Sequence, residues 1–386
     1  MSELNSFDFI LPTKIRFGFG ISGELENEIK ALRKKTVMLV TDKGLIRAGI
    51  VDKVLAQLSG KVKKDLTVFD EVEPNPRDTT VQRAYETAKA KGVDVLVAVG
   101  GGSSMDVAKG VSVLLTNGGA IGDYEGLDRV KKETAPVIAI PTTVGTGSEV
   151  TFWSVITDTK RHFKMSVGST MIAPKVALVD PDLVVSLPPA VIASTGMDAL
   201  THAIEGYTCK LAEPITDACG IYAIRYIAEN IRNAVYTDDK EAKAKMLLGS
   251  LIAGICFGNS DIAAVHAMAE ALGGLYDTPH GIANAIMLPY VMEYNYVAST
   301  KKFAEIAGAM GECISGDSER DAAYKAVTAV RKLNEDLNIP TLKEIGARAE
   351  DFEELSAKSE VNVSTESNPR KITKDDFLKI FQKAYA

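Results

Sequence analysis

The segment DVLVAVGGGSSMDVAKG (residues 94–110) predicts a short strand, a turn of three glycines and a helix that begins at Ser103 or Ser104. Its aliphatic run is typical of a strand buried on both faces of a sheet. Glycine allows a ligand to approach the backbone closely, and the amides at the start of a helix attract an anion such as a pyrophosphate. The spacing differs from the GxGxxG dinucleotide fingerprint, so a nucleotide-binding turn and a simple tight turn both fit this segment alone.

The alternation of strand and helix continues on both sides of this segment. It predicts parallel βαβ units, and therefore an open, mostly parallel sheet with helices on both faces. A change of pattern within residues 151–167 predicts a two-stranded hairpin. The other predicted strands are 36–42, 67–70, 137–140 and 175–180, and the predicted helices are 45–58 and 78–91.

Paired prolines mark a change of character at SLPP (186–189), after which helical periodicity dominates. Proline ends regular structure, and a chain of 386 residues exceeds the usual size of one hydrophobic core. We therefore predict an α/β dinucleotide-binding domain over residues 1–187 and an all-helical, metal-binding catalytic domain over residues 188–386. The polar stretch SAKSEVNVSTESNPRK (356–371) is predicted to be a loop between terminal helices.

The composition is that of an ordinary globular enzyme, with 46% apolar and 25% charged residues, which argues against disorder. The net charge of −7 gives no long-range attraction to nucleic acid or to anionic membranes. No apolar run reaches the length of a transmembrane helix, and the first residues lack the layout of a signal peptide. We expect a soluble, cytoplasmic protein whose scattered cysteines are reduced core thiols, namely Cys209, Cys219, Cys256 and Cys313.

A second loop rich in glycine and hydroxyl groups, IPTTVGTGSEVT (140–151), follows another predicted strand. Two such loops at strand ends favour a dinucleotide lying across the edge of the sheet over a simple turn. Asp42 ends the predicted strand 36–42. A carboxylate there can accept hydrogen bonds from the adenosine ribose and repel an added 2′-phosphate, or it can cap the helix that follows.

Three of the chain's four histidines lie in the second half, in apolar surroundings. In TGMDALTHAIEGY (195–207), Asp198 and His202 are four residues apart, so both lie on one helix face. His266 and His280 stand on either side of a pair of glycines. One carboxylate and three imidazoles suit a first-row divalent metal, and Fe(II), Zn(II) and Mn(II) are all compatible with this set. A lone histidine in a helix is more often a core residue, but this grouping favours a metal site.

Six motifs spread over essentially the whole chain are GGGSSMDVAK (100–109), PTTVGTGSEVT (141–151), TGMDALTHAIEGY (195–207), PITDAC (214–219), HAMAEALGGLYDTPHGIANA (266–285) and NPR (368–370). Together they resemble the iron-containing (group III) alcohol dehydrogenases, and their joint occurrence is far more specific than any one of them. The resemblance implies a nucleotide-binding domain followed by a helical domain, in a dehydroquinate synthase-like architecture.

The resemblance also implies roles for individual residues. The metal ligands would be Asp198, His202, His266 and His280, and His280 is also a candidate catalytic residue. The implied metal is Fe(II), with zinc or manganese as alternatives, and the implied cofactor is NAD, because NAD preference in the family goes with an acid where Asp42 stands. Cofactor contacts are expected at Asp42, Asn75, Gly101, Gly102, Ser103, Asp106, Thr142, Thr143, Thr146, Thr151, Lys164 and Leu183.

The implied reaction is hydride transfer between NAD(H) and a small primary alcohol or aldehyde, a diol or hydroxyaldehyde included. A metal with an open coordination position stabilises an alkoxide and polarises a carbonyl, and the nicotinamide carries the hydride. We therefore expect a small-molecule substrate, no nucleic-acid or membrane partner, and a homodimer or larger homo-oligomer.

Two positions depart from the family pattern. Many members carry histidine where this chain has Glu270, and some carry cysteine where it has Ser364. Glu270 lies four residues after His266, on the same predicted helix face. It either borders the substrate pocket and disfavours anionic aldehydes, which makes it a candidate catalytic-site residue, or it is an outer carboxylate that orients a ligand.

Two other functions fit parts of the pattern. A lyase or cyclase related to dehydroquinate synthase would share the architecture, but a phosphate-rich substrate needs a basic cluster that is not seen near the histidines of the helical half. A non-catalytic nucleotide-binding scaffold with a structural metal would favour thiolate ligands, and this set contains none. His162, in the charged segment RHFK (161–164), is expected to be solvated.

Overall fold

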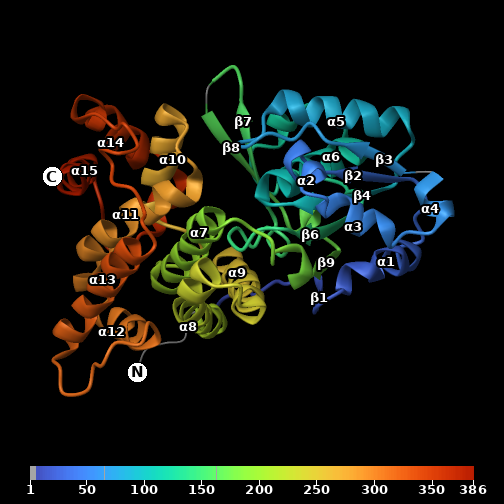
Figure 1. Cartoon of the computed structure of the whole chain (residues 1–386). Helices are drawn as coiled ribbons and strands as arrows, with labels where there is room; N and C mark the ends of the chain where they lie inside the picture. The colour runs from blue at the N-terminus through green and yellow to red at the C-terminus, as the bar shows by residue number, and fades with distance from the viewer. Residues whose placement is uncertain (1–5, 65, 162) are drawn as a thin grey trace. The chain divides into compact units, whose positions relative to one another are not determined.

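A computed structural model describes residues 6–64, 66–161 and 163–386 (Figure 1). The chain divides into two compact units. One unit comprises Leu11–Thr143 and Gly147–Ser186 and contains every strand in the described residues. The other comprises the described residues up to Ile10, the short segment Val144–Thr146, and Leu187–Ala386. The predicted division between residues 187 and 188 placed the residues up to Ile10 and the segment Val144–Thr146 in the first domain, whereas in the structure they group with the helices.

The α/β unit is built on a six-stranded sheet whose strands pair in parallel in the order β1-β9-β6-β4-β2-β3. This confirms the predicted open, parallel sheet. Its strands are β1 Lys14–Phe17, β2 Val37–Val40, β3 Leu66–Phe69, β4 Val95–Gly100, β6 Val137–Pro141 and β9 Val176–Val179. The α-helices of this unit are α1 Leu25–Ala31, α2 Lys43–Arg47, α3 Ile50–Ala56, α4 Gly60–Lys64, α5 Asp78–Ala90 and α6 Gly102–Asn117.

Both faces of this sheet are buried, as the aliphatic strands predict. Met38 and Val40 of β2 pack into an apolar cluster with α5 and α6, whereas Val37 and Leu39 pack into a second cluster with α1 and α3. The two clusters lie on opposite faces because successive side chains of a strand alternate in direction. Helices thus cover both faces, which is the usual environment of a parallel sheet.

The predicted hairpin is present as part of a second sheet. Strands β7 Trp153–Asp158 and β8 Phe163–Gly168 are antiparallel, and the two-residue strand β5 Gly126–Leu127 pairs with β8 in parallel. The 3-10 helices of the α/β unit are η1 Ile21–Glu24, η2 Ile121–Tyr124, η3 Thr170–Ile172 and η4 Pro181–Leu183.

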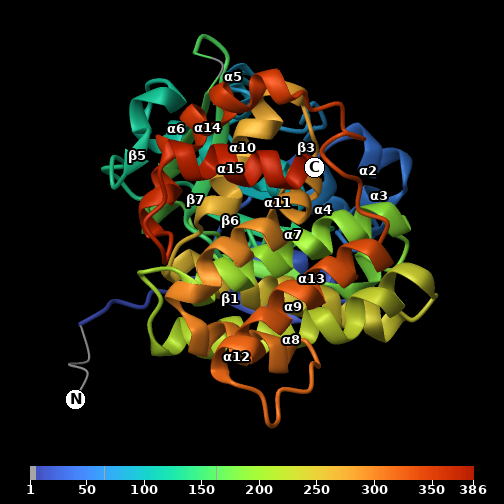
Figure 2. The ribbon, with the colours of Figure 1, turned by 90° about the vertical axis from the view of Figure 1, so that its left-hand side faces the viewer.

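The second unit is helical throughout its described residues, and Figure 2 turns its helices towards the viewer. Its first two long helices begin with proline, at Pro189 and Pro214, because the missing N–H has no partner at the first helical position. Its α-helices are α7 Pro189–Thr208, α8 Pro214–Tyr236, α9 Lys240–Asn259, α10 Ala264–Tyr276, α11 His280–Asn295, α12 Thr300–Ala309, α13 Glu319–Asp336, α14 Phe352–Glu360 and α15 Lys374–Tyr385. Its 3-10 helices are η5 Tyr296–Ala298, η6 Ala349–Asp351 and η7 Val363–Ser367.

Several local predictions were wrong. The predicted helix 45–58 is two helices, α2 and α3, because Gly49 adopts a left-handed conformation with φ 71° between them. The predicted loop 356–371 is partly helical, since its first residues continue α14 and its centre forms η7. Cys313 is exposed in the segment after α12 and Cys219 is only partly buried, so only Cys209 and Cys256 are core thiols.

Among the described residues, no single helix is both long and apolar enough to cross a membrane. Only α9 and α10 together pass that test, and they are bent by 103° with respect to each other.

Candidate metal centre and nucleotide-binding loops

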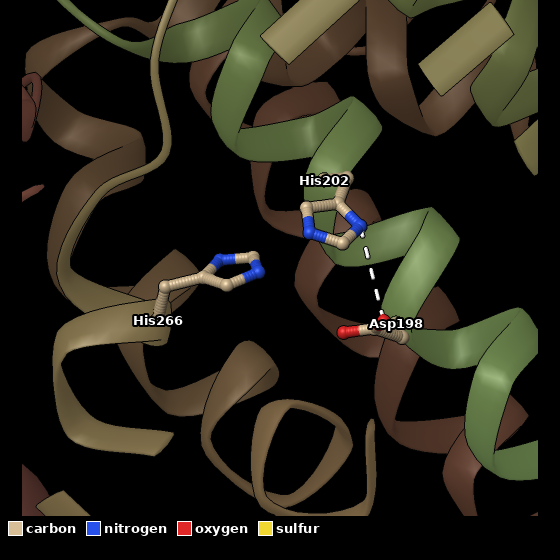
Figure 3. A group of neighbouring side chains, drawn as sticks. All are labelled: Asp198, His202 and His266. Atoms are coloured by element: carbon tan, nitrogen blue, oxygen red, sulfur yellow. Dashed lines mark ion pairs between the residues drawn. The ribbon is translucent and has the colours of Figure 1, made fainter. Parts of the chain in front are cut away.

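Helix α7 presents Asp198 and His202 on one buried face. They are one turn apart, and Oδ2 of Asp198 lies 4.0 Å from Nδ1 of His202 (Figure 3). Both side chains are buried, with relative exposures of 3% and 6%. A buried carboxylate is costly unless it is paired or binds a metal, so this buried pair is a candidate functional site.

His266, in the first turn of α10, completes a group of three. Its ring lies against the ring of His202, with 4.5 Å between ring centres, and it is 1% exposed. One potential ligand atom from each of Asp198, His202 and His266 lies within 4.8 Å of the others (Figure 3). His266, which lies 64 positions after His202 in the sequence, therefore converges with the α7 pair on one point of the helical unit.

These three residues fit a divalent metal ion. Within the described residues, buried Nδ1 of His202 and buried Nε2 of His266 have no hydrogen-bond partner. Such atoms are costly unless they bind something, and a set of imidazole nitrogens and a carboxylate suits a first-row divalent metal. Burial lowers the pKa of His202 to about 4 despite the neighbouring Asp198, so this imidazole is neutral near pH 7, as a metal ligand must be.

His280, the first residue of α11, lies beside this group and is more exposed. Its Nε2 is 3.8 Å from Oδ1 of Asp198, and its side chain is 32% exposed. Nδ2 of Asn284, one turn further along α11, donates to Oδ1 of Asp198 at 2.7 Å and contacts Nε2 of His280 at 3.2 Å. An amide nitrogen can only donate, so Nε2 of His280 is the acceptor in this contact.

Glu205 is a buried member of this region that sequence reasoning missed. It lies on α7 seven residues after Asp198, and its carboxylate accepts a hydrogen bond from Nδ1 of His266 at 2.6 Å. The signal that could have found it is its spacing, since residues four and seven positions after Asp198 share one helix face.

Asn362 forms hydrogen bonds with both Glu270 and Ser364, the two positions that depart from the family pattern. Glu270 is partly buried on α10, and its Oε2 accepts a hydrogen bond from Nδ2 of Asn362 at 2.6 Å. Oδ1 of Asn362 in turn caps η7 by accepting from the backbone N–H of Ser364 at 3.0 Å.

The negative charge of Glu270 also acts on His266. Burial opposes protonation of His266, but the Glu205 hydrogen bond and the charges of Glu205, Asp198 and Glu270 together raise its pKa.

In the α/β unit, the turn after β4 requires glycine at positions 100 and 101, because neighbouring side chains leave little or no room for a Cβ atom. A Cβ on Gly100 would lie 2.3 Å from Oγ of Ser104, and a Cβ on Gly101 would lie 3.1 Å from Cγ2 of Thr143. Helix α6 begins at Gly102, slightly before the predicted start. The turn therefore brings the first N–H groups of a sixteen-residue helix next to the second predicted loop, an arrangement that attracts anions.

Asp42 caps the short helix α2. Its Oδ1 accepts a hydrogen bond from the backbone N–H of Leu45 at 3.0 Å. This is the capping role considered from the sequence. The cap uses only one carboxylate oxygen of Asp42, so the carboxylate can still accept a hydrogen bond from a ribose.

Asn75 and Lys164 come together through Thr157 of β7. Asn75 adopts a left-handed conformation with φ 51°, and its carbonyl accepts from Oγ1 of Thr157 at 3.4 Å. Thr157 is the cross-strand partner of Lys164 on β8. Two predicted cofactor contacts that are far apart in the sequence therefore share one neighbour.

Lys109 of α6 anchors the second loop from inside the unit. It is fully buried, and its Nζ donates to Oγ of Ser148 at 2.8 Å, to Oγ1 of Thr151 at 3.2 Å and to the carbonyl of Trp153 at 2.8 Å. Burial raises the pKa of Asp106, one turn earlier, against the opposing charges of Lys109 and Lys164. Glu149 of the loop is 1% exposed, and burial raises its pKa to about 7.

The remaining predicted cofactor residues have different environments. Thr142, Thr151 and Leu183 are buried, and Leu183 belongs to the apolar cluster shared with α1 and α3. Thr146 groups with the helical unit rather than with the α/β unit. Ser103 lies in the first turn of α6 and is partly buried. His162, expected to be solvated, lies outside the described residues.

Comparison with family models gives two matches that together span most of the chain. Residues 12–181 match the model described as iron-containing alcohol dehydrogenase, and residues 192–385 match the model of the Fe-containing alcohol dehydrogenase family, C-terminal.

Individual relatives match over their full length. The chain is 42% identical over 383 residues to 1,3-propanediol dehydrogenase of Citrobacter freundii, covering 98% of this chain and 99% of the relative. It is 39% identical over 379 residues to NAD-dependent methanol dehydrogenase of Bacillus methanolicus (98% and 99%) and 40% identical over 379 residues to lactaldehyde reductase of Escherichia coli strain K12 (97% and 99%). A solved structure of 1,3-propanediol oxidoreductase is similar with a TM-score of 0.96 at 40% identity, covering 99% of this chain and all of that one.

Proposed function

This chain belongs to the iron-containing alcohol dehydrogenase family, and on that premise we propose that it transfers a hydride between NAD(H) and a small primary alcohol or aldehyde, with Fe(II) as its metal. The observation that carries the proposal is the buried group of Asp198, His202 and His266, in which two imidazole nitrogens have no hydrogen-bond partner among the described residues.

In this proposal Asp198, His202, His266 and His280 hold the metal. When bound, the metal supplies Lewis acidity that favours an alkoxide over an alcohol and polarises an aldehyde carbonyl. The chain's own residues prepare for this by burial, because a dry site strengthens every electrostatic interaction within it. Asn284 donates to Oδ1 of Asp198 and so holds this carboxylate in place, whereas its contact with Nε2 of His280 uses the lone pair that this nitrogen would give to a metal.

The α/β unit holds NAD in this proposal. The N-terminus of α6 and the Gly100–Gly102 turn suit the pyrophosphate, and Asp42 suits the adenosine ribose. Lys109 positions the hydroxyl groups of Ser148 and Thr151 in the second loop, which supports this use of the loop. Because a carboxylate repels a 2′-phosphate, the proposal includes a preference for NAD over NADP.

The substrate class follows from the same premise. The three relatives reported above are named for propanediol, methanol and lactaldehyde, which are small and uncharged. We propose a substrate of that kind, a diol or hydroxyaldehyde included, with Glu270 disfavouring anionic aldehydes through its negative charge. A cytoplasmic location and a homodimeric or larger assembly belong to the proposal as well. Four cysteines that are free in the structure support a reducing compartment.

The deciding experiment is a panel of alcohols and aldehydes assayed with NAD(H) and NADP(H), on full-length protein reconstituted anaerobically with Fe(II). We expect steady turnover of NADH with small neutral aldehydes and metal bound at one site per chain. Protein that binds stoichiometric Fe(II) and NADH but oxidises no NADH with any aldehyde of the panel would contradict the proposed reaction.

A further inference from the structure

Glu205 makes an unusual number of contacts for one buried carboxylate. It is 3% exposed on α7, and its Oε1 accepts from the backbone N–H of Val265 at 2.7 Å. Its Oε2 accepts from the backbone N–H of Ala263 at 2.9 Å, from Nδ1 of His266 at 2.6 Å and, at a longer 3.4 Å, from the backbone N–H of His266. One side chain of α7 thus binds both the start of α10 and the imidazole that α10 carries.

The backbone contacts explain how α10 begins. Its N-cap residue is Ala263, which has no side chain able to accept a hydrogen bond from the first turn. Uncapped N–H groups at a buried helix end are costly, and a negative charge there is favourable. Glu205 therefore acts as the cap of α10 from a different helix.

The side-chain contact decides which nitrogen of His266 is available. Both oxygens of Glu205 accept backbone N–H groups, so the carboxylate presents only acceptors to the imidazole. Nδ1 of His266 must then carry the proton, and Nε2 keeps its lone pair. Nε2 is the buried ring atom that lacks a hydrogen-bond partner within the described residues, and His266 is the residue that groups with Asp198 and His202.

From this geometry we propose that Glu205 is the positioning residue of the metal centre, which fixes the ring orientation and the tautomer of His266 so that Nε2 can bind the metal. The proposal rests on the metal ligands assigned under the proposed function. A carboxylate that accepts from the far nitrogen of a ligating imidazole also makes that ligand more basic, and losing such a partner typically weakens metal binding by about 10- to 100-fold.

A purely structural role, in which Glu205 only caps α10, is separable from this one. Glu213 offers a matched control because it is a buried glutamate of the same unit, 8% exposed, that caps α8. Its carboxylate accepts from the backbone N–H groups of Ile215 and Thr216, both at 2.8 Å. Glu205→Gln and Glu213→Gln therefore both weaken a helix cap, but only Glu205→Gln also alters the partner of an imidazole.

The experiment titrates metal-free, full-length protein with Co(II), followed by visible absorption, and measures the melting temperature of each metal-free variant. We expect both variants to melt earlier than the unmodified protein, and only Glu205→Gln to lose Co(II) affinity, by about 10-fold or more. Unchanged affinity in Glu205→Gln, or an equal loss in Glu213→Gln, would overturn the proposal.

A second measurement needs no variant. The chain has only four histidines, so ¹⁵N-labelling of histidine in the metal-free protein allows the ring nitrogens of His266 to be assigned. At a pH high enough that the ring carries one proton, we expect that proton on Nδ1 and not on Nε2, and the opposite tautomer would overturn the proposal even if Glu205→Gln did not fold. If the unmodified protein binds no Co(II), the proposed function fails, whereas normal binding with an unaffected Glu205→Gln variant refutes only the role of Glu205.

Discussion

Nδ2 of Asn362 donates a hydrogen bond to Oε2 of Glu270 across 2.6 Å and so links α10 to the segment that precedes the NPR motif. Through its own Oδ1, Asn362 also holds the backbone of Ser364. The two positions at which this chain departs from the family pattern therefore form one hydrogen-bonded unit. A histidine at position 270 would have to fit the same asparagine, whereas residue 364 is held through its backbone N–H, so a cysteine there would keep that contact.

The first prediction concerns the charge of Glu270. Glu270→Gln keeps an oxygen that can accept from Asn362 and removes only the negative charge. We expect the ratio of kcat/KM for glycolaldehyde to kcat/KM for glyoxylate to fall by about 10-fold, because the anionic aldehyde is no longer repelled. Glu360→Gln removes the same charge from an exposed site on α14 and should leave the ratio unchanged. An unchanged ratio in Glu270→Gln, with activity and metal content intact, would show that Glu270 does not sense substrate charge.

The second prediction concerns the proposed metal ligands. His266→Ala, His202→Ala and His280→Ala should each lower metal affinity by orders of magnitude and abolish turnover, because the remaining residues no longer close the site. Elemental analysis after dialysis measures the loss directly. Asp180→Asn is the control, since Asp180 is a buried carboxylate, 1% exposed, that binds backbone N–H groups of the α/β unit. It should cost stability without removing metal. Full occupancy and activity in the histidine variants would refute the assignment.

The third prediction separates the two roles of Asp42. Asparagine caps a helix about as well as aspartate, so Asp42→Asn should preserve the cap on Leu45 and remove the charge that opposes a 2′-phosphate. We expect the preference for NADH over NADPH to fall by about 10-fold, with little change in melting temperature. Asp42→Gly should relax the preference equally and cost a few tenths of a kcal/mol in stability through the lost cap. A lower KM for NADPH than for NADH in the unmodified protein would show that Asp42 does not face the ribose.

The fold was predictable to the extent that it depends on local patterns. Aliphatic strands alternating with amphipathic helices predict a parallel sheet covered on both faces, and β4 and α6 are found where that pattern places them. Strand β1 was missed because it is an edge strand of four residues, KIRF, with two charged side chains and no clear alternation. The break at Gly49 was missed because glycine inside an amphipathic segment does not by itself end a helix.

The candidate site divides in the same way. Asp198 and His202 were predictable as neighbours because the i, i+4 spacing of a helix brings them together. The roles of Glu205 and Asn362 depend on which helix packs next to them, and no local spacing encodes that contact. Lys109 is a further case, since a lysine in an amphipathic helix is usually solvated, whereas here it is buried against a loop about 40 residues away.

The last prediction concerns Glu149 and the pH dependence of stability. Its carboxyl group is 1% exposed, and its Oε1 has no hydrogen-bond partner among the described residues. Burial raises its pKa from 4.5 to about 7, although the nearby charge of Lys109 opposes this. Between these two values the folded chain keeps a proton that the unfolded chain has lost. The contribution of Glu149 to stability therefore falls as pH rises from 4.5 to about 7 and then stays constant.

Glu149→Gln removes this titration, so the variant should be about as stable as the unmodified protein near pH 4 and more stable near pH 8, by on the order of 1–3 kcal/mol. Urea unfolding at both pH values measures the difference. Glu28→Gln is a control of opposite sign. Burial of Glu28 is outweighed by its bonds to Lys14 and Arg16, which lower its pKa, so losing its charge should destabilise the protein near pH 8. A Glu149→Gln effect that is the same at both pH values would show that folding does not raise the pKa of Glu149.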